Sequence, residues 1–223
     1  MCFKKYLTLL IRRTILHLKG MGLLFWIPVA MVYGLIPLIA VLTCRKYGIS
    51  GEFVTNVIQF SLLLIPLFSC WWAIFLLREY LEGDGNEILY VCRAKGKGAD
   101  VLFTFIVYFV GVLIQYSVYI ALMPRMALEV VRLLCISLFY LGLSYFLMFL
   151  TRSTAVTVMA VLVYTVGNYL SAGLTAETFF PFYFDAGFTT LHTLGAVCLP
   201  MLVCGLVLFA GGVQMNRRAL RFN

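Results

Sequence analysis

The stretch Arg78–Asp100, REYLEGDGNEILYVCRAKGKGAD, is the one long polar run in a chain that is apolar over most of its length. It holds five of the nine acidic residues and four of the 17 lysines and arginines. Long apolar runs lie on both sides of it. Because charged side chains are costly inside a bilayer, we predict that this segment lies in water between two membrane-spanning helices, where it is available to a partner.

The composition is that of a polytopic membrane protein. Of 223 residues, 63% are hydrophobic and 12% are charged, whereas soluble domains carry about a quarter charged residues. The apolar runs are long and continuous, which predicts an all-α integral membrane fold and not a β-barrel. The formal net charge of +8 is interpreted as basic loops that set orientation and meet anionic headgroups of the lipid bilayer, so no nucleic-acid partner is expected.

Motifs for catalysis and metal binding are absent from the sequence. The seven cysteines show no CxxC spacing and mostly lie in apolar runs, so they are interpreted as small core hydrophobes, with no metal site and no disulfide. There is no HExxH motif, no GxxxxGK[ST] phosphate loop and no pair of aspartates inside an apolar run. The two histidines, His17 and His192, are expected on opposite sides of the membrane. We therefore expect neither an enzyme nor an ATP site in this chain.

Hydropathy divides the single transmembrane domain, residues 1–223, into one interfacial helix and six spans. In residues 1–19, apolar side chains recur at helical spacing and basic ones supply the polar side. This pattern predicts an amphipathic helix at the membrane surface, with a plain orientation signal as the alternative. The six spans are predicted at about 21–44, 53–77, 101–123, 133–150, 155–174 and 191–213.

Orientation follows from the distribution of lysine and arginine. Six spans place both termini on one side, together with the Arg78–Asp100 segment and a tight turn at 151–154. Thirteen of the 17 lysines and arginines fall on that side, among them Arg152 in the turn. By the positive-inside rule, we expect both termini and the charged segment in the cytoplasm, in a plasma membrane.

Polar residues inside the predicted spans are uncharged, and every acidic residue falls at or near a span end. This pattern argues against proton or sodium coupling and favours energy supplied by another chain. Asn56 and Gln59 share one face of the second span, and Thr165 and Asn168 share one face of the fifth. Such rows mediate helix packing in membranes; a substrate path and a dimer face are the alternatives.

Residues 175–190, between the last two spans, are rich in aromatic side chains and contain no lysine or arginine. The run is continuous and includes a central Pro181. We predict an outer re-entrant segment whose rings dip back into the membrane, with a simple aromatic anchor as the alternative.

Glycines divide the charged segment. Gly83 and Gly85 break the helix that leaves the second span, because glycine disfavours helix interiors and permits positive φ. Asn86 can cap a new helix that begins at Glu87 and carries apolar side chains such as Leu89. We predict a short helix lying across the ends of two spans, with a charged rim suited to a transient protein contact. A solvated loop is the alternative.

With this short helix, the chain resembles the permease subunits of bacterial type-2 ABC exporters. Those proteins share an amphipathic helix before the first span, six spans, a cytoplasmic coupling helix between spans two and three, and an outer re-entrant segment between spans five and six. Their segment after span two is similar to E-x-x-x-x-G-T-x-E-x-L-L followed by a basic residue. The residues in comparable places are Glu79, the Gly83–Gly85 turn, Glu87, Leu89 and Arg93; the threonine is absent and Asp84 is inserted among the glycines.

The resemblance implies that a separate ABC ATPase subunit docks on this segment. It implies a dimer of two permeases, identical or different, with two ATPase subunits that hold ATP and Mg²⁺, while this chain binds no cofactor and acts as a transport subunit. Arg152 in the tight turn is expected to give a second, smaller cytoplasmic contact. The residues expected at the ATPase dock are Glu79, Glu82, Gly83, Asp84, Gly85, Asn86, Glu87, Leu89 and Arg93.

The expected function is outward export of a hydrophobic or amphipathic substrate such as a peptide, lipid or drug. The apolar spans without buried charge favour such a substrate. One alternative is a non-transporting membrane scaffold or immunity protein that binds a cytoplasmic partner through the same loop. Another is a lipid-modifying enzyme, which needs a cluster of charges at one membrane face beyond those that docking explains.

Overall fold

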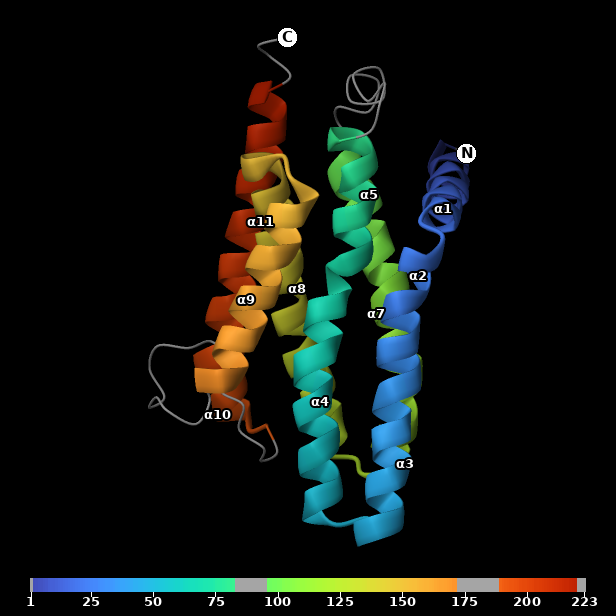
Figure 1. Cartoon of the computed structure of the whole chain (residues 1–223), viewed down its shortest axis with the longest axis vertical. Coiled ribbons are helices and arrows are strands. Elements are labelled where there is room, and N and C mark those ends of the chain that lie inside the picture. The colour runs from blue at the N-terminus through green and yellow to red at the C-terminus, as the bar shows by residue number, and fades with distance from the viewer. Residues whose placement is uncertain (1, 83–95, 172–188, 220–223) are drawn as a thin grey trace.

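The computed structural model describes residues 2–82, 96–171 and 189–219, and these residues form helices with no strand among them (Figure 1). The all-α prediction is therefore confirmed for the described residues. In chain order the elements are α1 (Cys2–Gly20), α2 (Leu23–Pro28), the π-helix η1 (Val29–Leu35), α3 (Ile36–Tyr47), α4 (Gly51–Ser69), α5 (Trp71–Leu81), α7 (Lys97–Leu122), α8 (Met126–Thr151), α9 (Thr154–Ser171), α10 (Leu191–Thr193), the π-helix η2 (Leu194–Cys198) and α11 (Leu199–Ala219).

Five helical runs among the described residues are long and apolar enough to cross a membrane. Each overlaps one predicted span. The predicted fifth span corresponds to α9, whose apolar stretch Thr154–Leu170 is shorter than the others. The five runs, with adjoining helices counted together, are Leu23–Tyr47, Gly51–Leu81, Lys97–Leu122, Met126–Thr151 and Leu194–Arg218.

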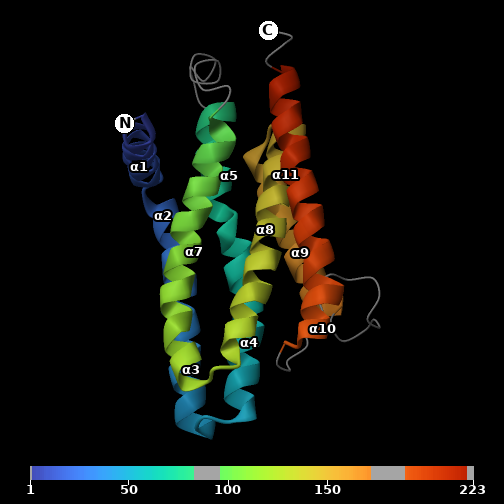
Figure 2. The same cartoon turned by 180° about the vertical axis from the view of Figure 1, so that it is seen from behind.

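The long helices stand side by side as a bundle, and α1 turns aside from it at one end (Figures 1 and 2). We call this end the N-terminal end of the bundle. It holds α1, the close of α5, the start of α7, the α8–α9 turn and the close of α11 (Figure 1). The α3–α4 and α7–α8 connections lie at the opposite end. The predicted interfacial helix is present as α1, and its position at a membrane surface stays a prediction.

Two tryptophans of α5 supply hydrogen bonds that the first span lacks. Pro28 has no N–H, so the carbonyl of Leu24 has no donor four residues along the helix. The indole Nε1 of Trp71 donates to this carbonyl at 3.1 Å, and Nε1 of Trp72 donates to the next carbonyl, that of Phe25, at 3.3 Å. The Trp72 ring also stacks on Phe25, with centroids 5.0 Å apart. Because unpaired carbonyls are costly in lipid, these bonds tie α2 firmly to α5.

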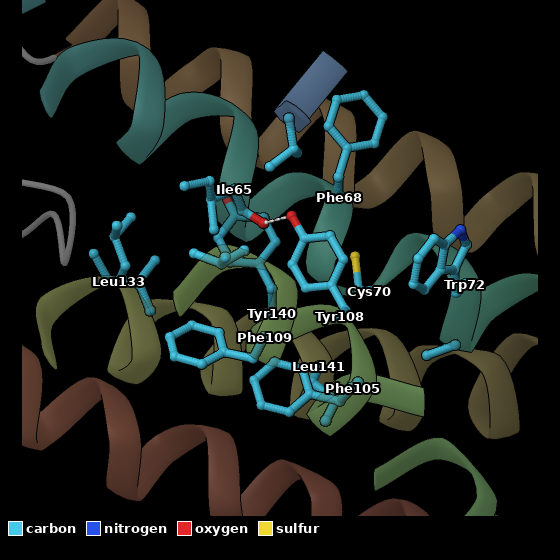
Figure 3. Close-up of a cluster of buried hydrophobic side chains, with 14 of the residues drawn as sticks. Ile65, Phe68, Cys70, Trp72, Phe105, Tyr108, Phe109, Leu133, Tyr140 and Leu141 are labelled. Carbon is cyan, nitrogen blue, oxygen red and sulfur yellow. Dashed lines mark hydrogen bonds between the residues drawn. The ribbon is translucent and has the colours of Figure 1, made fainter. Parts of the chain in front are cut away.

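The predicted second span is not one continuous helix, because it breaks at Cys70 into α4 and α5. The break follows Pro66, which removes one hydrogen bond from the helix. The hydroxyl of Ser69 donates to the Pro66 carbonyl at 2.7 Å. The hydroxyl of Tyr108 on α7 donates to the Ile65 carbonyl at 2.9 Å, the bond drawn in Figure 3. These donors satisfy the carbonyls beside the break within the buried core of α4, α5, α7 and α8.

The helices α8 and α11 approach each other closely because glycines face across their contact. A Cβ atom added to Gly142 of α8 would lie 2.0 Å from the carbonyl oxygen of Gly205 on α11. One added to Gly205 would lie 2.6 Å from the Cα atom of Phe139. Further along α11, Gly212 leaves 2.6 Å between an added Cβ and the ring of Tyr145. Small residues permit this approach in membranes, where close packing drives helix association.

Two helix starts differ from the predicted span boundaries. Helix α7 begins before the predicted residue 101, and α8 begins before the predicted residue 133. The predicted loops at these places are therefore too long. Their charged residues continue the helices because each of them has polar partners within the fold. The four buried charged residues that were expected in loops are Lys97, Asp100, Glu129 and Arg132.

Replacing Gly205 with alanine is expected to destabilise the protein, since the new methyl group meets the backbone of α8. Overpacking of this kind costs about 1–3 kcal/mol. Gly34→Ala in η1 is the matched control, because no described residue lies within 4 Å of the added Cβ position. Thermal unfolding of the full chain in detergent measures both variants. Equal melting temperatures for Gly205→Ala and the unsubstituted chain would contradict the close packing.

Candidate functional site

Two of the residues expected at the ATPase dock are described, Glu79 and Glu82, at the close of α5. The predicted short helix lies outside the described residues, and so does most of the predicted re-entrant segment. The candidate site described here is therefore the N-terminal end of the bundle around α5. The other dock residues, also outside the described part of the chain, are Gly83, Asp84, Gly85, Asn86, Glu87, Leu89 and Arg93.

Glu82 binds the first residue of α9. One oxygen of its carboxylate accepts from the amide of Thr154 at 2.5 Å, and the other accepts from the Thr154 hydroxyl at 2.9 Å. The first amides of a helix have no partner within the helix, and the helix dipole favours a negative charge beside them. Arg78, one turn before Glu82, lies 3.6 Å from the same carboxylate. Glu82 therefore joins the close of α5 to the start of α9.

Arg152 lies in the turn between α8 and α9, two residues before Thr154. Its backbone is left-handed, with a φ of 51°, and its amide donates to the Met148 carbonyl at 3.0 Å, which ends α8. Its side chain is exposed. The sequence places Glu82 and Arg152 at two separate contacts with a partner. The structure brings them together, because Glu82 is bound directly beside the turn.

His17 of α1 contacts two consecutive residues of α5. Its Nδ1 pairs with the carboxylate of Glu79, and its Nε2 lies 3.2 Å from the hydroxyl of Tyr80. The Glu79 carboxylate also lies against Gly20, 3.3 Å from an added Cβ position. His17 and Glu79 are 62 positions apart in the chain. No local pattern in the sequence pointed to His17, and only the fold shows that it ties α1 to α5.

Buried polar contacts continue from α5 to α7 and α11. The hydroxyl of Tyr80 donates to Oδ2 of Asp100 at 3.3 Å. The fully buried Nζ of Lys97 donates to Asn216 of α11 at 3.4 Å. The same Nζ lies 5.9 Å from the ring centroid of Tyr80 and 6.0 Å from that of Phe149. Buried charges need partners of this kind, and these partners join α5, α7, α8 and α11 at one end of the bundle.

A second buried ionic cluster lies at the opposite end. Glu129 and Arg132 of α8 are almost fully buried, with 3.5 Å between the guanidinium and the carboxylate. Glu129 accepts from the amide of Thr189 at 2.6 Å, and Arg132 donates to the Thr189 hydroxyl at 3.2 Å. The pair therefore holds the residues that precede α10 against α8. The i, i+3 spacing of the two charges suits an ion pair on a helix. In a hydropathy profile, however, two charged residues so close together indicate the end of a span.

The two polar rows predicted on the spans have different surroundings. Asn56 and Gln59 are half-buried on α4, and the amide group of Asn56 donates within its own helix at 2.9 Å. Thr165 and Asn168 are buried on α9, where the hydroxyl of Thr165 lies 2.8 Å from that of Tyr140 on α8. The α9 row thus packs inside this chain. A contact with substrate or with a second permease stays a prediction for all four residues, and the α4 row is the more open.

Among the residues that the structure describes, no three His, Cys, Asp or Glu side chains gather as metal ligands would. Comparisons with protein-family models, with curated proteins and with solved structures return no match for this chain. The candidate site is the set of polar contacts at the N-terminal end of the bundle, where α1, α5, α7, α9 and α11 meet.

Glu82→Ala is expected to loosen the start of α9, because it removes the acceptor of the Thr154 amide. Loss of such a cap makes hydrogen exchange of the first amides of α9 about five-fold faster. Hydrogen–deuterium exchange of the full chain in lipid nanodiscs measures this. Glu52→Ala, at an exposed glutamate of the opposite end, is the control and leaves these amides unchanged. Unchanged exchange in Glu82→Ala would argue against the cap.

Glu129→Ala is expected to cost about 3–5 kcal/mol of stability, because it removes both the carboxylate that pairs with the buried Arg132 guanidinium and the acceptor of the Thr189 amide. The double substitution Glu129→Ala with Arg132→Met removes both charges and is expected to cost less than the single one. Chemical unfolding measures the free energy of unfolding of the unsubstituted chain and of both variants. A single variant no less stable than the double one would show that the ion pair does not matter to the fold.

Proposed function

We propose that this chain is the permease subunit of an ATP-driven type-2 ABC exporter. It crosses the plasma membrane six times with both termini in the cytoplasm and pairs with a second permease. It moves a hydrophobic or amphipathic substrate, such as a peptide, lipid or drug, outward on energy from a separate ATPase subunit. ATP and Mg²⁺ belong to that subunit.

In this proposal α9, the predicted fifth span, also crosses the membrane and brings the number of spans to six. Its 18 residues extend about 27 Å as a helix, which approaches the roughly 30 Å thickness of the hydrocarbon layer. The sequence continues the apolar run at residues 172–174. Six spans place α1 and the close of α11 on the same side of the membrane, and both lie at the N-terminal end of the bundle (Figure 1).

The observation that carries the proposal is the junction of Glu82 with Thr154. The expected docking segment begins directly after α5, and Arg152, the second expected contact, stands beside Thr154. One partner beneath this end of the bundle would therefore contact both places. Movement of that partner would reach α5 and α9 through Glu82, and α1 through the pair of Glu79 with His17. Closure of two ATPase subunits would then tilt the first, second and fifth spans.

The distribution of buried charge supports an apolar or amphipathic substrate. Within the described residues, the buried charged side chains lie near the starts of α7 and α8. These two helix starts lie at opposite ends of the bundle (Figure 1). The middle of the bundle is lined by apolar and aromatic side chains with uncharged polar groups among them, and ions are poorly stabilised in such surroundings.

Glu87→Arg reverses a charge at the expected start of the docking helix, and we expect loss of ATPase binding and of transport. The tagged full chain is purified from its native membrane, and the ATPase is recognised by its GxxxxGK[ST] loop. Glu52→Arg, at the opposite end of the bundle, is the control and retains the ATPase. Normal transport by Glu87→Arg with its ATPase still attached would overturn the docking site. If the unsubstituted chain retains no ATPase, the exporter hypothesis fails and the non-transporting membrane scaffold takes its place.

A further inference from the structure

A concave groove of about 610 Å³ lies at the elbow between α1 and α2, and its volume is within the roughly 300–1,000 Å³ range of small-molecule sites. Gly22 forms the elbow, because its φ of 56° lets the chain turn from one helix into the other. Figures 1 and 2 show α1 turning aside from the line of α2. Most of the groove is apolar, and Lys19 is the charged residue that lines it.

Both walls of the groove are fixed to the same helix. The wall from α2 is held by the Trp71 and Trp72 indoles of α5, which donate to backbone carbonyls at 3.1 and 3.3 Å. The wall from α1 is held by His17, which pairs with Glu79 of α5. The groove is therefore formed before anything binds in it, and a preformed site avoids the entropic cost of ordering its walls.

The groove offers an apolar surface beside a positive one. Leu23 is 86% exposed and Trp26 is 61% exposed, although both belong to the first apolar run. Lys19 next to them is exposed. Tryptophan is favoured at the level of lipid headgroups, with its ring against acyl chains. A ligand with a long apolar chain and a charged head matches this arrangement.

The charge of α1 indicates that the head group of such a ligand is negative. The helix carries five basic residues and no acidic one. Glu79, the acidic group that lies against Gly20 beside the elbow, is paired with His17. The net charge of α1 is therefore positive, and anionic lipids are attracted to clusters of basic residues at a membrane surface.

We propose that the elbow groove binds an anionic phospholipid. Its acyl chain lies against Leu23 and Trp26, and its phosphate lies at Lys19. The site is a property of the first two helices and does not depend on whether the chain transports anything.

The test uses tryptophan quenching by brominated lipids. The full chain is reconstituted in phosphatidylcholine vesicles that contain a small fraction of brominated phosphatidylglycerol or brominated phosphatidylcholine. Three tryptophans are present, so the signal of Trp26 is taken as the difference between the unsubstituted chain and Trp26→Phe. We expect brominated phosphatidylglycerol to quench this signal at about a five-fold lower mole fraction than brominated phosphatidylcholine, the preference that one well-placed cation gives at a membrane surface.

Three variants at exposed lysines separate the groove from general membrane charge. Lys19→Gln is expected to abolish the preference, and Lys19→Arg to keep it. Lys46→Gln, at an exposed lysine at the close of α3 at the opposite end of the bundle, is the matched control and keeps it as well. Equal quenching by the two lipids in the unsubstituted chain overturns the proposal. A loss of the phosphatidylglycerol preference in Lys46→Gln as large as that in Lys19→Gln also overturns it. Absence of quenching by either lipid overturns it as well, because it would show that protein, such as a second copy of this chain, covers the groove.

Discussion

Every carbonyl that loses its helical partner inside an apolar bundle needs another donor, and much of this fold depends on how those donors are supplied. Pro28 frees the carbonyl that Trp71 binds, and the break after Pro66 is closed by hydroxyls from Ser69 and Tyr108. The Trp71 bond joins α2 to α5 and the Tyr108 bond joins α4 to α7, whereas the Ser69 bond lies within α4. The first span is thereby held by α5, and the kinked second span by α7.

Two kinds of contact hold the bundle together. The glycines of α8 and α11 bring two backbones together in close packing. At the N-terminal end, α5 meets α1 and α9 through polar side-chain contacts, among them those of Glu79 with His17 and of Glu82 with Thr154. The tilting that we propose for the first, second and fifth spans would act at these side-chain contacts.

The sequence predicts the helices well and their contacts poorly. Long apolar runs are a direct consequence of membrane burial, so the described spans fall where hydropathy puts them. The predicted span boundaries are wrong where a helix continues through charged residues. Lys97 and Glu129 resemble span ends in a hydropathy profile, yet both are buried within helices beside polar partners. Glu82 and Thr154 are 72 positions apart, and no local pattern reports such a pair. The docking residues within 83–95 stay a prediction.

The pair of Glu79 with His17 belongs to both proposals. Helix α1 forms one wall of the elbow groove, and α5 leads into the expected dock, so the contact between these helices connects the two proposed sites. Two binding equilibria that depend on the same arrangement of α1 and α5 are linked, and the linkage is reciprocal. If a bound lipid raises the affinity for the ATPase by some factor, the bound ATPase raises the affinity for the lipid by the same factor. If both sites are used, α1 does more than orient the chain, because it lets the membrane surface bias the binding of the ATPase.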